Sequence, residues 1–81
     1  MKAAVVRKLA GDHTAAELEA GAEAIAEREE DELGVDGDDL GEKLTHLMLA
    51  LRVRQRVDAG EELKAAWRDE MRSVRALLTN E

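Results

Sequence analysis

The chain has 81 residues, a formal net charge of −7 and no cysteine, which allows one small domain and excludes a disulfide framework, a cysteine-ligated zinc site and a thiol nucleophile. It shows neither an apolar run long enough to span a membrane nor a secretory signal pattern, so we expect a cytoplasmic protein. The balance of 19 acidic against 12 basic residues argues against binding to nucleic acid.

Helix is favoured along most of the chain, because proline is absent and Ala, Leu, Glu and Arg are abundant. Residues 2–10 are too short to classify by periodicity, and either an extended lead-in or one or two helical turns fits them. Thr14 followed by Glu17 is the pattern of a capping box and predicts a first helix over residues 15–30. An acidic ridge follows this helix at helical spacing: Glu19, Glu23, Glu27 and Glu30.

A second helix is predicted over residues 40–59, after a loop rich in Gly and Asp in which Asp38 or Asp39 provides the N-cap. This helix has two apolar stripes on roughly opposite sides. One stripe contains Leu40, Leu44, Leu47 and Leu51, and the other contains Leu49, Val53 and Val57. A helix that is apolar on two sides is usually central and packs against neighbours on both.

A third helix is predicted over residues 61–78, with one broad apolar face and one basic flank. The apolar face contains Leu63, Ala66, Trp67, Met71, Val74, Leu77 and Leu78, and the basic ridge contains Lys64, Arg68, Arg72 and Arg75. Glu70 falls inside the apolar arc, where a carboxylate needs a partner. We expect it to pair with Arg52, Arg54 or Arg56, although a cluster with His46 and Glu42 or an edge position open to water also fits the pattern.

The predicted architecture is a single all-α domain over residues 1–81: a three-helix bundle with a short N-terminal lead-in, completed by dimerisation. A core this small gives only marginal stability, and small domains often gain further stability by oligomerisation. We expect the second apolar stripe of this helix, formed by Leu49, Val53 and Val57, to be buried between two copies of the chain. Trp67, Arg68, Arg72 and Arg75 are further candidates for an interaction surface, because Trp and Arg often anchor interfaces.

Catalytic motifs are absent from the sequence, and we predict no catalytic residues and no cofactor. Weak candidates for metal ligation are Glu42, His46 and Glu70; the first two share a helix face at i and i+4. Di-iron bundles use Glu-x-x-His and more carboxylates. A metal-carboxylate protein whose site forms only in the oligomer is therefore the alternative to a small non-catalytic interaction protein that self-associates.

The opening KAAVVRKLA, the central GEKLTHLMLALRVRQRVDAG and the final WRDEMRSVRALL resemble a family of short bacterial proteins of unknown function. The resemblance covers most of the chain and implies an all-helical fold without established catalytic residues. It also implies an association with thioredoxin-like peroxidases, and hence a further alternative, a regulatory subunit of a redox enzyme. Because the chain lacks cysteine, it would act there only as a binding partner.

Overall fold

The computed structural model describes the backbone of residues 1–79 and the side chains of residues 1–77, so the predicted core position of the Leu78 side chain lies outside the described residues. The fold is all-α. Its helices are α1 (Ala3–Asp12), α2 (Ala15–Arg28), α3 (Leu40–Asp58) and α4 (Leu63–Thr79). The prediction of a three-helix bundle is therefore corrected: the described residues form four helices, and the N-terminal segment is one of them.

Helix α1 replaces the predicted lead-in because its apolar residues have a buried surface to pack against. Val6, Leu9 and Ala10 occupy positions i, i+3 and i+4, and all three are buried. The helix continues through Gly11 to Asp12, and His13 then adopts an extended backbone that leads into the next helix. A ten-residue helix is marginal by itself, so tertiary packing is what stabilises α1.

Helix α2 begins with the predicted capping box, which is confirmed. The Thr14 hydroxyl accepts a hydrogen bond from the Glu17 N–H at 3.1 Å, and the Glu17 carboxylate accepts one from the Thr14 N–H at 2.8 Å. The helix ends at Arg28, two residues before its predicted end at residue 30, because Glu29 adopts a left-handed conformation with φ 56°. The loop over residues 29–39 starts there.

Helix α3 is capped at both ends by local hydrogen bonds. The Asp39 carboxylate accepts from the Glu42 N–H at 2.8 Å, which makes Asp39 the N-cap. At the other end, Gly60 has φ 111°, and the N–H groups of Gly60 and Glu61 donate to the carbonyls of Val57 and Arg56. These two bonds form a Schellman motif, which explains why the chain turns sharply from α3 into α4.

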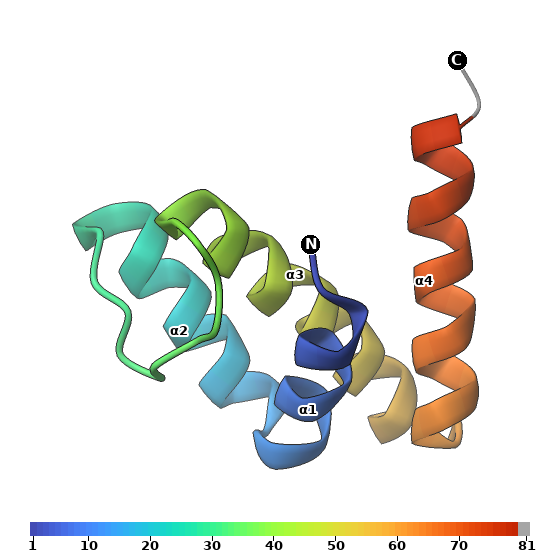
Figure 1. Ribbon diagram of the computed structural model, residues 1–81. Coiled ribbons are helices and arrows are strands. Elements are labelled where there is room, and N and C mark those ends of the chain that lie inside the picture. Colours follow the sequence, from blue (N-terminus) through green and yellow to red (C-terminus); the bar gives the residue numbers. More distant parts are fainter. Residues whose placement is uncertain (80–81) are drawn as a thin grey trace.

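Helix α3 lies at the centre and contacts the other three helices (Figure 1). Helices α2 and α4 lie on opposite sides of it and make no contact with each other within the described residues. Figure 1 also shows that the C-terminal half of α4 extends beyond the other helices. Within residues 1–79, no helix combines the length and the apolar character that crossing a bilayer requires.

The core is formed by apolar side chains from all four helices and from the loop over residues 29–39. Its buried members are Val6, Leu9, Ala10, Leu18, Ile25, Val35, Leu47, Leu49, Ala50, Val53, Ala66 and Met71. The prediction that Leu77 belongs to the core face of α4 is wrong, because this residue is 76% exposed. The C-terminal half of α4 extends beyond the other helices, so within residues 1–79 this part of its apolar face has no neighbouring helix to pack against.

Candidate protein interaction surface

Trp67 joins α4 to α1. Its indole N–H donates a hydrogen bond of 2.8 Å to the Ala3 carbonyl, and the Arg7 guanidinium lies 5.3 Å from the ring centroid. The residue is half-buried. Trp67 therefore fixes the angle between the two helices and still presents part of its ring at the surface.

A groove of about 390 Å³ runs beside this contact between α1 and α4. Its lining consists of Ala3, Trp67, Arg68, Met71, Arg72 and Arg75, which we call the α1–α4 groove. A smaller hollow of about 140 Å³ adjoins it and is lined in part by Met1 and Val74. Aromatic residues, Met and Arg are the side chains enriched at protein interfaces, so this lining suits contact with another protein.

The structure thus brings together four of the seven predicted interaction residues: Trp67, Arg68, Arg72 and Arg75. The three arginines are exposed and follow one another at i, i+4 and i+7 on α4. Arg72 lies 3.7 Å from the Asp69 carboxylate, an exposed contact that neutralises little of its charge. The apolar lining of the groove is therefore bordered by positive charge.

The other predicted interaction residues lie elsewhere. Leu49 and Val53 are buried within the chain itself, and Val57 is half-buried. They belong to the core that α3 shares with its neighbours. The second apolar stripe expected from the sequence is therefore not a free surface, because the core of the chain itself already buries Leu49 and Val53.

Glu70 holds α4 against α3 through two arginines, as predicted. Its carboxylate lies 3.3 Å from Arg52 Nε and 3.3 Å from an Arg56 guanidinium nitrogen, and the residue is only 7% exposed. Arg56 also binds Glu61 and Asp69, each at 2.7 Å. Hydrogen bonds to Glu61 and Asp69 raise the pKa of Arg56, and the Arg56 partner lowers the pKa of Glu61. This cluster sets the direction in which α4 leaves the fold.

We expect Glu70→Ala to lower the free energy of unfolding by about 2 kcal/mol, because it removes a buried charge-assisted contact between helices. Arg56 would still pair with Glu61 and Asp69 in this variant. The loss of stability should therefore be smaller than for a buried ion pair whose remaining partner has no other contact. Glu70→Gln should cost about half as much. Urea denaturation of the wild-type chain and of both variants measures these differences in the free energy of unfolding. Lys64→Ala, at an exposed position of α4, is the control, and an equal effect of the two alanine variants would contradict the buried pairing.

The weak metal candidates do not come together. His46 is fully buried, and both of its ring nitrogens form hydrogen bonds. Nε2 accepts a hydrogen bond from the Lys2 N–H at 2.9 Å, and Nδ1–H donates one to the Asp36 carbonyl at 2.8 Å. Glu42 binds the N-terminal amine at 3.1 Å. Glu70 lies with its arginines at the α3–α4 contact. Among the described residues, no three His, Asp or Glu side chains are placed to hold a metal.

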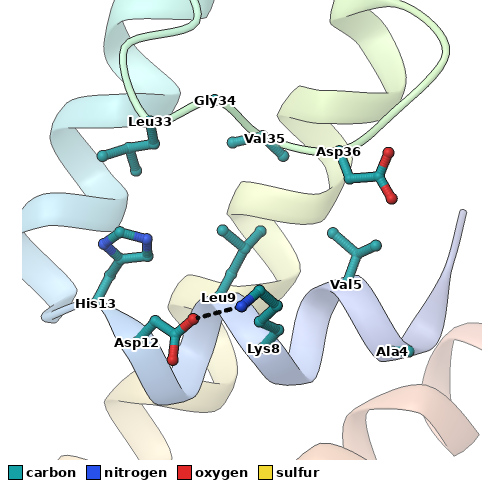
Figure 2. A pocket seen from close by; sticks show the side chains of 10 residues that line it. All are labelled: Ala4, Val5, Lys8, Leu9, Asp12, His13, Leu33, Gly34, Val35 and Asp36. Atoms are coloured by element: carbon teal, nitrogen blue, oxygen red, sulfur yellow. Dashed lines mark ion pairs between the residues drawn. The ribbon is translucent and has the colours of Figure 1, made fainter.

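A second hollow, of about 310 Å³, lies between α1 and the loop over residues 29–39 (Figure 2). Apolar side chains from both segments line it, among them Leu9 and Val35. Lys8 and Asp12 lie at its edge and pair with each other at 3.2 Å. Its volume is at the lower end of the range for ligand sites, about 300 to 1,000 Å³. Its lining residues contain no pairing of nucleophile and base, so the arrangement points to no reaction.

Asp31 closes the loop over residues 29–39. Its two oxygens accept from the Val35 N–H at 3.0 and 2.8 Å, and Lys43 Nζ lies 3.2 Å away. Partial burial favours the neutral acid, but the Val35 N–H and Lys43 outweigh it, so the pKa of Asp31 lies below its ordinary value. Asp31 therefore anchors the buried Val35 to α3.

Because the folded state lowers the pKa of Asp31, its carboxylate stabilises the fold at neutral pH, and this contribution disappears as the pH falls below about 4. We expect Asp31→Asn to cost about 1–2 kcal/mol at pH 7 and almost nothing near pH 2. Urea denaturation across this range measures the difference. Asp38→Asn, an exposed substitution in the same loop, is the control and should cost under about 0.5 kcal/mol at both pH values.

The described residues thus form a small all-α domain of four helices, with an arginine-bordered groove between α1 and α4. Residues 1–78 match a family of unknown function, DUF6952, and the chain belongs to this family. The resemblance to an uncharacterised family is thereby confirmed over nearly the whole chain, whereas no link to peroxidases is shown. Comparisons with curated proteins and with solved structures give no match.

Proposed function

We propose that this chain is a small, non-catalytic interaction protein that self-associates through the α1–α4 groove and the exposed end of α4. The observation that carries the proposal is Leu77, which is 76% exposed one helical turn beyond Val74 and the hollow that adjoins the groove. Met1, which lines that hollow, is 49% exposed. Two large apolar side chains are thus exposed near a surface of Trp, Met and Arg, a composition typical of interfaces.

Burial of this surface by a second copy would also support a marginal core. A domain of this length buries only about 60% of the surface of its unfolded chain, and it contains no disulfide. Small domains commonly gain stability from oligomerisation. The proposal replaces the stripe of Leu49, Val53 and Val57 with the α4 surface, because only the latter has apolar side chains open to a partner.

Sedimentation equilibrium at micromolar concentration tests the proposal. We expect the wild-type chain to associate and Leu77→Gln to shift it toward monomer without loss of helix content. Met48→Gln is the matched control, since Met48 is 56% exposed on α3 and is not among the residues that line the groove, so its replacement should leave association unchanged. A monomeric wild-type chain, or equal effects of both variants, would contradict self-association through α4.

The association with thioredoxin-like peroxidases is an alternative in which the same surface binds a redox enzyme. The chain would contribute a surface and no redox group, because it contains no cysteine. Capture of a peroxidase by the wild-type chain and not by Leu77→Gln would support this form. The metal-carboxylate alternative predicts near-stoichiometric iron, manganese or zinc in the purified protein, which elemental analysis measures.

A further inference from the structure

Helix α2 carries a row of acidic side chains on its outer surface. Glu19, Glu23 and Glu27 are exposed at i, i+4 and i+8, and within residues 1–79 none of them has an ion-pair partner. Glu30, the fourth member of the predicted ridge, instead lies 3.4 Å from Arg28. At 1.5 Å per residue, the three unpaired carboxylates cover about 12 Å of helix. We call these three residues the α2 acidic ridge.

Helix α4 carries the opposite charge over a matching length. Arg68, Arg72 and Arg75 extend over about 10 Å of helix and border the α1–α4 groove. We call them the α4 basic ridge. The two ridges cannot meet within one chain, because α2 and α4 lie on opposite sides of α3 and make no contact in the described residues (Figure 1).

We propose that the α2 acidic ridge of one copy lies on the α4 basic ridge of a second copy. This inference rests on the proposed self-association and adds the surface that the groove binds. A second copy is the occupant favoured by charge: the first 42 residues contain 13 acidic and 4 basic residues, and the remaining 39 contain 6 acidic and 8 basic residues. Each copy thus brings both halves of a complementary pair.

The shape of α2 is compatible with this contact. Ala16 and Ala20 are exposed beside the acidic ridge, and such small side chains allow another helix to approach closely. The apolar contact would involve Trp67 and Leu77 at the partner's groove. Exposed ion pairs contribute little affinity individually, so the ridges mainly orient the two copies.

The contact joins two different faces of the molecule. It gives a closed, isologous dimer if both ridges of one copy contact the same partner, and a ring or an open chain if they contact two different neighbours. The net charge of −7 opposes association at long range, but salt near 0.1 M screens charges beyond about 10 Å and leaves contacts between touching ridges.

Charge reversal tests the inference in the full chain. The acidic-ridge variant replaces Glu19, Glu23 and Glu27 by Arg, and the basic-ridge variant replaces Arg68, Arg72 and Arg75 by Glu. Each variant alone should associate at least about tenfold more weakly than wild type in sedimentation experiments at 0.1 M salt, because like charges then face each other. An equimolar mixture should recover the association, since each variant offers a complement to the other.

A matched control separates the ridge from the overall charge. Replacing Glu29, Glu32 and Asp38 by Arg moves the formal net charge from −7 to −1, the same change as in the acidic-ridge variant, but alters only the loop over residues 29–39. This control should associate like wild type. Circular dichroism confirms that each variant keeps its helix content, so that loss of association is not loss of the fold.

The outcomes distinguish the two proposals. Failure of the mixture to recover association, or an equal loss in the loop control, would overturn the ridge contact. If Leu77→Gln weakens association while both ridge variants associate like wild type, the self-association proposal stands and the ridge contact fails. A monomeric wild-type chain would overturn both, and binding of the α4 surface to some other acidic protein would then be the remaining explanation for the basic ridge.

Discussion

Trp67→Ala is expected to lower the free energy of unfolding by about 3 kcal/mol. The substitution removes the ring that packs between α1 and α4, the hydrogen bond of 2.8 Å to the Ala3 carbonyl and the stacking of Arg7. Because the residue is half-buried, the effect lies at the low end of the range for loss of a Trp side chain. Urea denaturation followed by circular dichroism measures it.

Trp67→Phe separates packing from hydrogen bonding. It keeps an aromatic ring and loses the indole N–H, so it should cost about 1 kcal/mol. Leu77→Ala, at an exposed position on the same helix, should cost under about 0.5 kcal/mol in the monomer. If Trp67→Ala were as mild as Leu77→Ala, the ring would not hold α4 on α1.

His46→Ala is expected to have a similar effect, a loss of about 3 kcal/mol. The imidazole is fully buried, so its removal leaves a cavity in the core. It also leaves the Lys2 N–H and the Asp36 carbonyl without their partner. The same unfolding measurement applies, and hydrogen exchange should show faster exchange of the α1 amides, because His46 ties the start of α1 to α3.

The other histidine is the control for this prediction. His13 is half-buried between α1 and α2, 3.9 Å from the exposed Glu17 carboxylate. His13→Ala should therefore cost under about 1 kcal/mol. Equal costs for the two alanine variants would contradict the role of His46 as the polar residue that links the N-terminus, the loop and α3.

The sequence by itself determined the elements whose signals are local. Thr14 with Glu17, and Asp39 before α3, satisfy N–H groups within their own helical turn, so the residues suffice to predict where α2 and α3 begin. The pairing of Glu70 with an arginine could also be predicted from the sequence. A carboxylate in an apolar arc needs a cation, and α3 offers arginines at helical spacing.

Tertiary structure alone decided whether residues 3–12 form a helix and which apolar residues remain exposed. A ten-residue segment gains too little from its own hydrogen bonds, so the helix depends on the burial of Val6 and Leu9 against distant parts of the chain. The packing of all four helices buries Leu49 and Val53, while the projection of α4 leaves Leu77 exposed. The α1–α4 groove follows from the same cause, because Ala3 and Trp67 lie 64 positions apart and only packing brings them together.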